Sequence, residues 1–288
     1  MKLRQAVMVL TMSVSLVSLS VPIFGQGGTP SLPARPWPPT RLPDGQPDVH
    51  GTTWRPVLGG SQSLDPAMSS ASDFEQRVNG VVAPRNPSRI IDPPDGHIPY
   101  QPWAAAMQKE LEASYENPTR PEHIDSQTRC MLEVPRLYYF PTFRILQQPN
   151  SVVFVWEEYH TFRVIPLDNR PRLAPGVKLW MGDGRGRWEG NTLVVETTNL
   201  KAKSRLDVIG DFFTDNALLL ERFVFVDANS MNYEVTVTDP TVFTRPWTMR
   251  VVERRQPDDE FLEWACHEGE RDSAVSAGAS SSTDDGRR

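Results

Sequence analysis

Short runs of β-branched and aromatic residues, separated by turn residues, fill the second half of the chain. Residues 147–150, 189–191, 227–230 and 256–259 are typical turn sequences. Because the loops are short and no strong helical pattern intervenes, the pattern predicts a mainly β fold. We expect an antiparallel meander, closed as a lipocalin-like barrel or folded as a sandwich. The predicted strands are Phe143–Gln148, Val152–Ile165 (with a bend left open), Arg187–Trp188, Thr192–Thr197, Leu219–Val226, Tyr233–Thr238, Trp247–Glu253 and Phe261–Cys266.

The first part of the chain has a different texture. Twenty of the 27 prolines lie between Pro30 and Pro149. Proline lacks a backbone donor and fixes φ, so this region cannot be mostly sheet or helix. Large apolar side chains nevertheless recur through residues 27–142, which predicts a segment that wraps around a core formed elsewhere. One helix is expected near 102–116, where Pro102 suits a first helical turn and good helix formers follow it.

Both ends of the chain predict segments that lie outside the β domain, which we place at residues 143–272. Lys2 and Arg4 precede an uncharged apolar run at 6–24, which is typical of a signal peptide over residues 1–26. A membrane anchor is the alternative, but the serines and the late proline in this run weaken it as a span. We therefore expect a periplasmic or secreted protein with no membrane span in its mature form. Residues 273–288 are small and polar, and we expect them to be disordered.

Charge and cysteine content narrow the functional classes. The net charge is −6 and no basic cluster lies on a predicted helix, which disfavours a nucleic-acid partner. Cys130 and Cys266 are the two cysteines, and in an exported protein such a pair is typical of one disulfide. It would close a loop of about 136 residues, for which chain entropy predicts roughly 4–5 kcal/mol of stabilisation. Two buried free thiols are the alternative.

Four motifs together resemble a widespread, largely uncharacterised family of exported bacterial β-rich proteins. They are LPDGQPD at 42–48, GRWEGNTLVVETT at 186–198, TDPTVFTRPW at 238–247 and EWACHEG at 263–269. The resemblance covers most of the predicted mature chain and implies export and a β-rich fold, but no particular activity. Members of the family usually carry Asp at the position of Asn191, which puts a metal-binding carboxylate there in doubt.

The segment 152–164 carries the first candidate site. If it is one strand, alternation places Trp156, Glu158, His160 and Phe162 on one face. Glu158 and His160 could then act as general acid and base between apolar walls. They could also contribute to a divalent metal site, with His160 and His267 as ligands. The alternative is a structural Glu–His pair on a solvated face. The sequence therefore leaves open whether the protein binds a divalent metal as cofactor.

Candidate ligand contacts come from the same region and from the next predicted hairpin. The segment 182–188 resembles a phosphate-binding loop, but a strand and not a helix follows it, so a tight hairpin is favoured. The three other histidines, His50, His97 and His123, lie in the proline-rich segment without a partner pattern. The predicted ligand-binding residues are Trp156, Phe162, Arg163, Arg187 and Trp188.

Three functions follow from these features. The first is a periplasmic small-molecule-binding protein with a barrel-like cavity. The second is a lyase or hydrolase that acts on a small extracytoplasmic substrate through Glu158 and His160. The third is an envelope-associated protein whose proline-rich segment contacts a partner. The chain contains no G-x-S-x-G serine motif and no H-E-x-x-H zinc motif.

Overall fold

The computed structural model describes residues 32, 37–51, 53–57, 63–65, 77–78, 81–82, 87–115, 117–126, 130–131, 134–135, 142–202 and 205–264. The predicted signal peptide, the predicted disordered tail, Cys266 and His267 lie outside these residues. The elements are β1 (Thr53–Pro56), β2 (Arg77–Val78), β3 (Val81–Val82), β4 (Ile90–Asp92), α1 (Pro102–Ala113), η1 (Pro121–His123), β5 (Phe143–Gln148), β6 (Ser151–Trp156), η3 (Glu158–His160), β7 (Phe162–Pro166), β8 (Asp183–Glu189), β9 (Thr192–Thr198), β10 (Leu218–Asp227), β11 (Ser230–Thr238) and β12 (Trp247–Gln256).

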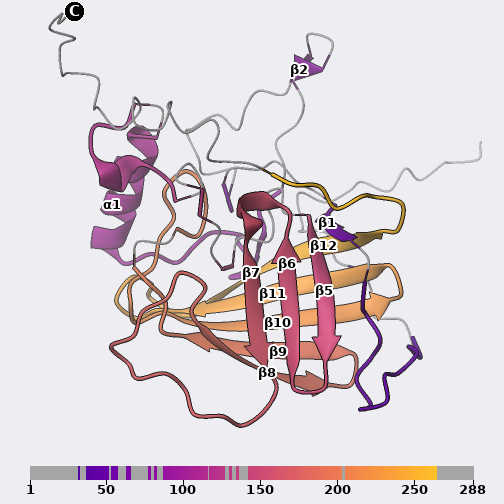
Figure 1. The fold of residues 1–288 in the computed structure, drawn as a ribbon. Coiled ribbons are helices and arrows are strands. Elements are labelled where there is room, and N and C mark those ends of the chain that lie inside the picture. Colours follow the sequence, from indigo (N-terminus) through magenta and orange to yellow (C-terminus); the bar gives the residue numbers. More distant parts are fainter. Residues whose placement is uncertain are drawn as a thin grey trace, which may run out of the picture.

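One antiparallel sheet dominates the structure and is nearly closed as a barrel. Its strands follow the order β7-β6-β5-β1-β12-β11-β10-β9-β8, and β4 pairs with β12 beside this path. Figure 1 shows β5, β6 and β7 crossing in front of β8 to β12, with α1 outside the sheet. The prediction of a mainly β, antiparallel, barrel-like fold with one short helix is confirmed.

The proline-rich segment contributes to the sheet as well as to its surroundings. β1 lies between β5 and β12, and it therefore joins two meanders that the later sequence forms by itself. Trp54 of β1 is buried and meets Phe225 edge to face, with ring centroids 5.7 Å apart. Burial of so large a side chain adds to the hydrophobic stabilisation that holds this short strand in place.

Alternation along the strands fills the barrel interior with large side chains. On β11, for example, Met231, Tyr233, Val235 and Val237 all face inward and are fully buried. Phe154 of β6 packs against Phe223 of β10 across the interior, with ring centroids 4.8 Å apart. The interior is therefore a packed core, as expected for a barrel of this size.

β7 and β8 close the barrel by side-chain contact. Both strands are fully described, and no backbone ladder joins them. Gly184 and Gly186 are inward positions of β8, and the side chains of β7 occupy the space that these glycines leave. A Cβ atom at Gly186 would lie 2.6 Å from Cγ2 of Ile165, and one at Gly184 would lie 3.1 Å from Nη2 of Arg163. We call this contact between β7 and β8 the glycine seam.

Two of the expected strands are wrong. The segment 152–165 is not one strand, because η3 interrupts it and the chain reverses, so that β6 and β7 form a hairpin. Tyr159 in this turn has a φ of 61°, in the left-handed region that few residues other than glycine adopt. At the end of the chain, Phe261–Trp264 forms no strand, and residues 265 and 266 lie outside the described residues.

Candidate functional site

The turn at η3 separates the residues that the alternation placed together. Trp156 ends β6 and is buried in the core, whereas Phe162 begins β7 on the outer surface and is 64% exposed. The expectation that Trp156, Glu158, His160 and Phe162 share one strand face is therefore wrong. His160 lies in η3, and its side chain is outside what the structure describes.

The remaining predicted ligand contacts lie in three different environments. Arg163 points into the barrel, whereas Arg187 is on the outside and pairs with Glu189. Trp188 is partly buried against the core, and its indole Nε1–H donates to Oε1 of Gln46 at 2.9 Å. The structure does not bring these three side chains into one binding site.

Arg163 belongs to a buried polar network inside the barrel. Its guanidinium forms a two-pronged pair with Glu221, with Nη1–Oε1 and Nη2–Oε2 distances of 2.9 and 2.7 Å. Thr197 and Tyr233 donate their hydroxyls to the same carboxylate at 2.7 and 2.8 Å. Burial alone would raise the pKa of Glu221, but the arginine charge and these hydrogen bonds hold it below the usual value. Both oxygens of the Glu221 carboxylate are occupied in this network, whereas Nε of Arg163 is buried without a hydrogen-bond partner in the described structure.

Glu158 is buried beside the turn of η3. Its Oε2 atom has no hydrogen-bond partner within the described structure, and burial raises its pKa to about 7. The predicted partner at 160 cannot be placed against it. With this pKa, about half of the Glu158 carboxyl groups are protonated at neutral pH.

No metal centre emerges from the described residues. Within the described ranges, no group of three or more His, Cys, Asp or Glu side chains is arranged to hold a metal ion. Of the predicted ligand pair, His267 and the side chain of His160 lie outside the described part of the structure.

A cavity beside helix α1 is the strongest candidate for a functional site in the described part of the chain. Its volume is about 400 Å³, which is in the range of small-molecule sites. We call it the α1 cavity. Its polar lining consists mainly of Asp65, His97, Tyr100, Gln108, Lys109 and Asp211.

Asp65 and His97 form one half of the polar wall. Oδ2 of Asp65 lies 2.5 Å from Nδ1 of His97, while the His97 side chain remains 43% exposed. The other carboxylate oxygen, Oδ1, is buried and has no hydrogen-bond partner in the described structure. Asp65 itself is 7% exposed. A buried acceptor without a partner is unfavourable unless a ligand or water supplies a donor.

Asp211 forms the other half of the polar wall, and the buried Asp207 lies against it. Oδ1 of Asp207 accepts the backbone N–H groups of Gly210 and Asp211 at 2.9 and 2.8 Å. Oδ1 of Asp211 accepts the Tyr100 hydroxyl at 2.8 Å. Of the two carboxyl groups, only that of Asp211 lines the α1 cavity, because Asp207 is fully buried behind it.

The two adjacent carboxyl groups cannot both be ionised at low cost. Burial raises the pKa of Asp211 well above its ordinary value, and the neighbouring charge of Asp207 raises it further. Burial also raises the pKa of Asp207, but its hydrogen bonds from Asp211 and the backbone oppose that rise. The proton therefore resides on Asp211, which donates it to the buried carboxylate of Asp207.

Close packing around a glycine positions this pair. Gly210 has a φ of +132°, and a Cβ atom there would lie 2.7 Å from Cβ of Leu111 on α1. No larger residue could bring the 207–211 loop so close to the helix. The loop then places Asp211 against Tyr100. The ring of Tyr100 packs on that of Phe243, with ring centroids 5.3 Å apart.

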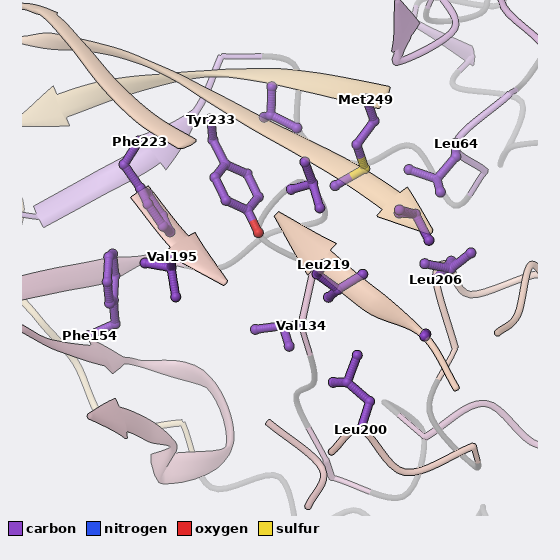
Figure 2. Packing of buried hydrophobic residues seen from close by; sticks show 14 of the residues in the cluster. Leu64, Val134, Phe154, Val195, Leu200, Leu206, Leu219, Phe223, Tyr233 and Met249 are labelled. Atoms are coloured by element: carbon purple, nitrogen blue, oxygen red, sulfur yellow. The ribbon is translucent and has the colours of Figure 1, made fainter. Parts of the chain in front are cut away.

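Two buried leucines attach the carboxylates to the core. Leu64 precedes Asp65 and Leu206 precedes Asp207, and both leucines are fully buried in the main hydrophobic cluster. Figure 2 shows them in the same packed region as Met249 of the barrel. The backbone N–H of Leu64 also donates to Oδ2 of Asp207 at 3.2 Å. The two halves of the site are therefore held on a rigid base.

Sequence reasoning missed this site. It treated His97 as a histidine without a partner, but the partner Asp65 lies 32 residues earlier. Tyr100 and Asp211 are 111 residues apart and meet only in the fold. The spacing D-x-x-G-D at 207–211 was a weak local signal, because a glycine between two aspartates favours a tight loop.

Comparison with known proteins adds no assignment. No protein-family model matches the chain, and no curated protein matches it either. Among the described residues, no helix has both the length and the apolar character that crossing a membrane requires.

Proposed function

We propose that the protein is an exported small-molecule-binding protein whose ligand occupies the α1 cavity. The observation that carries this proposal is the convergence of an unpartnered buried acceptor on Asp65 with the carboxyl group of Asp211 on one cavity of about 400 Å³. The basic start of the chain and the apolar run at 6–24 support export.

The chemistry of the lining favours a neutral, polyhydroxylated ligand such as a monosaccharide. Asp65 offers an acceptor, whereas the ammonium group of Lys109 and the side-chain amide of Gln108 offer donors. Hydroxyl groups can both donate and accept, so they satisfy such a mixed wall. A strongly charged ligand would meet charges of both signs in the lining.

Thermal unfolding with D-glucose, D-xylose and myo-inositol tests this proposal. A ligand at about 100 times its Kd adds roughly 2.7 kcal/mol to the free energy of unfolding, which raises Tm by about 5 °C or more. We expect at least one of the three to produce such a shift in the wild type. Asp65→Asn and His97→Gln should reduce it.

The control variant is Asp168→Asn, which alters an exposed ion pair with Arg170 and should keep the full shift. His97 is half exposed, so His97→Gln gives a folded comparison if Asp65→Asn is unstable. The proposal is wrong if none of the three compounds raises Tm, or if the shift is the same in both site variants.

We also propose the disulfide between Cys130 and Cys266. Cys130 is buried and has a φ of 57°, and Cys266 lies outside the described residues. Intact-mass analysis of the exported, unreduced protein should give a mass about 2 Da below that of the reduced chain. Alkylation of both cysteines without prior reduction would contradict the bond.

A further inference from the structure

Helix α1 lines a second cavity with a different side of its surface. Ala105, Gln108 and Lys109 line the α1 cavity, whereas Met107 and Leu111, which are one turn apart, lie on another side of the helix. They line a cavity of about 170 Å³, which we call the Met107 cavity. Its apolar lining consists of Met107, Leu111, Pro121, Ile124, Ala202 and Phe212.

Contacts between its walls hold the Met107 cavity open. Gly210 packs against Leu111 and so joins its loop to α1. Arg120, at the start of η1, pairs with Glu110 of α1. Nη2 of Arg205 donates to a backbone oxygen of η1, which joins the third wall to the second. Because the three walls are joined in pairs, the cavity is preformed for a ligand and does not fill itself by collapse.

The inner surface of this cavity is apolar. Leu111, Ile124 and Phe212 are each at most 7% exposed and form its floor. Met107 is 42% exposed, so it lies where the cavity opens to solvent. The guanidinium of Arg205, which also belongs to the lining, takes part in the contact between two walls. An uncharged molecule therefore suits this lining better than a charged one, which would lose its hydration on entry.

The side chains around the cavity favour an aromatic molecule. Phe212 belongs to an aromatic cluster, with its ring centroid 6.0 Å from that of Trp103 and 6.1 Å from that of Tyr100. An aromatic ligand would extend this cluster by packing on the ring of Phe212. The sulfur of Met107 offers a polarisable contact, and its flexible side chain can adapt to the shape of the ligand.

We propose that the Met107 cavity binds one small, uncharged aromatic molecule of one or two fused rings, such as indole. A dry cavity of about 150 Å³ lined by Leu, Ile and Phe accepts benzene, which sets the size of the occupant. This inference goes beyond the proposed function, because it concerns a different cavity and a different class of ligand.

Isothermal titration of the purified full chain with indole tests the inference. We expect saturable binding of one indole per chain in the wild type. Ala202→Phe adds a ring to the cavity from an exposed position, and Met107→Lys places a charge at its opening. Each substitution should raise the Kd for indole about tenfold or more. Leu173→Lys is the matched control, because Leu173 is also 42% exposed but is not part of this lining, and it should keep the wild-type Kd.

Asp65→Asn separates the Met107 cavity from the α1 cavity, and it should bind indole with the wild-type Kd. Loss of indole binding in Asp65→Asn, with unchanged binding in Ala202→Phe and Met107→Lys, would place the compound in the α1 cavity and overturn the inference. If Ala202→Phe does not fold, Met107→Lys alone decides between the two cavities. A wild type that does not bind indole also overturns the inference, and leaves the monosaccharide binding proposed for the α1 cavity unaffected.

Discussion

Glu221→Gln is expected to lower the free energy of unfolding by about 3–5 kcal/mol, since it leaves the Arg163 guanidinium buried without its counter-charge. Both side chains are almost completely enclosed, with 3% of Arg163 and 0% of Glu221 exposed. Unfolding in urea, followed by tryptophan fluorescence, would measure the loss.

A matched control is available on the outer surface of the same sheet. Glu234 pairs with Arg250 at 2.8 Å, and both side chains are more than a fifth exposed. Glu234→Gln should cost less than about 1 kcal/mol. The double variant Arg163→Met with Glu221→Leu should regain much of the lost stability, because it removes both buried charges. Equal decreases in the free energy of unfolding in Glu221→Gln and Glu234→Gln would contradict the prediction.

Glu158→Gln is expected to stabilise the protein by about 3 kcal/mol at pH 8 and to change its stability little at pH 4. The pKa of Glu158 is about 7 in the fold against an ordinary value of 4.5. Between these values the folded state binds more protons than the unfolded state, so the free energy of unfolding falls as pH rises from about 4.5 to 7. A difference of about 2.5 pKa units corresponds to roughly 3 kcal/mol.

Denaturant unfolding of both forms at several pH values would measure this effect. In the wild type the group lowers stability above pH 7, and in Glu158→Gln that dependence should be absent. Glu260→Gln changes an exposed glutamate and should leave the pH dependence as it is. A wild-type and a Glu158→Gln curve that run parallel from pH 4 to 8 would contradict the prediction.

The sheet was predictable from the sequence because strands are encoded locally. Alternation within 233–238 predicts which residues face the core, and turn residues mark where each strand ends. The failure at 152–165 has a local cause as well. Tyr159 adopts a left-handed conformation, and nothing in its residue type signals that.

The site was not predictable for a different reason. Arg163 and Glu221 become partners only when β7 and β10 face each other across the barrel. In the same way, Asp65, Tyr100 and Asp211 meet through packing against α1 and the core. Pairs so distant in the sequence carry no short spacing that a motif could capture, and a single sequence cannot reveal them.

The glycine seam is the line along which the barrel can widen without breaking backbone hydrogen bonds. Everywhere else around the ring, widening the structure would break rows of hydrogen bonds between neighbouring strands. Between β7 and β8 there is no such row, and widening would break only side-chain interactions, namely the contact of Ile165 with Gly186 and the bonds of Arg163 to Thr197 and Glu221. Local opening of the domain should therefore begin between β7 and β8. Amide hydrogens of Phe162–Pro166 and Asp183–Glu189 that face the gap should then exchange with deuterium before those of β11.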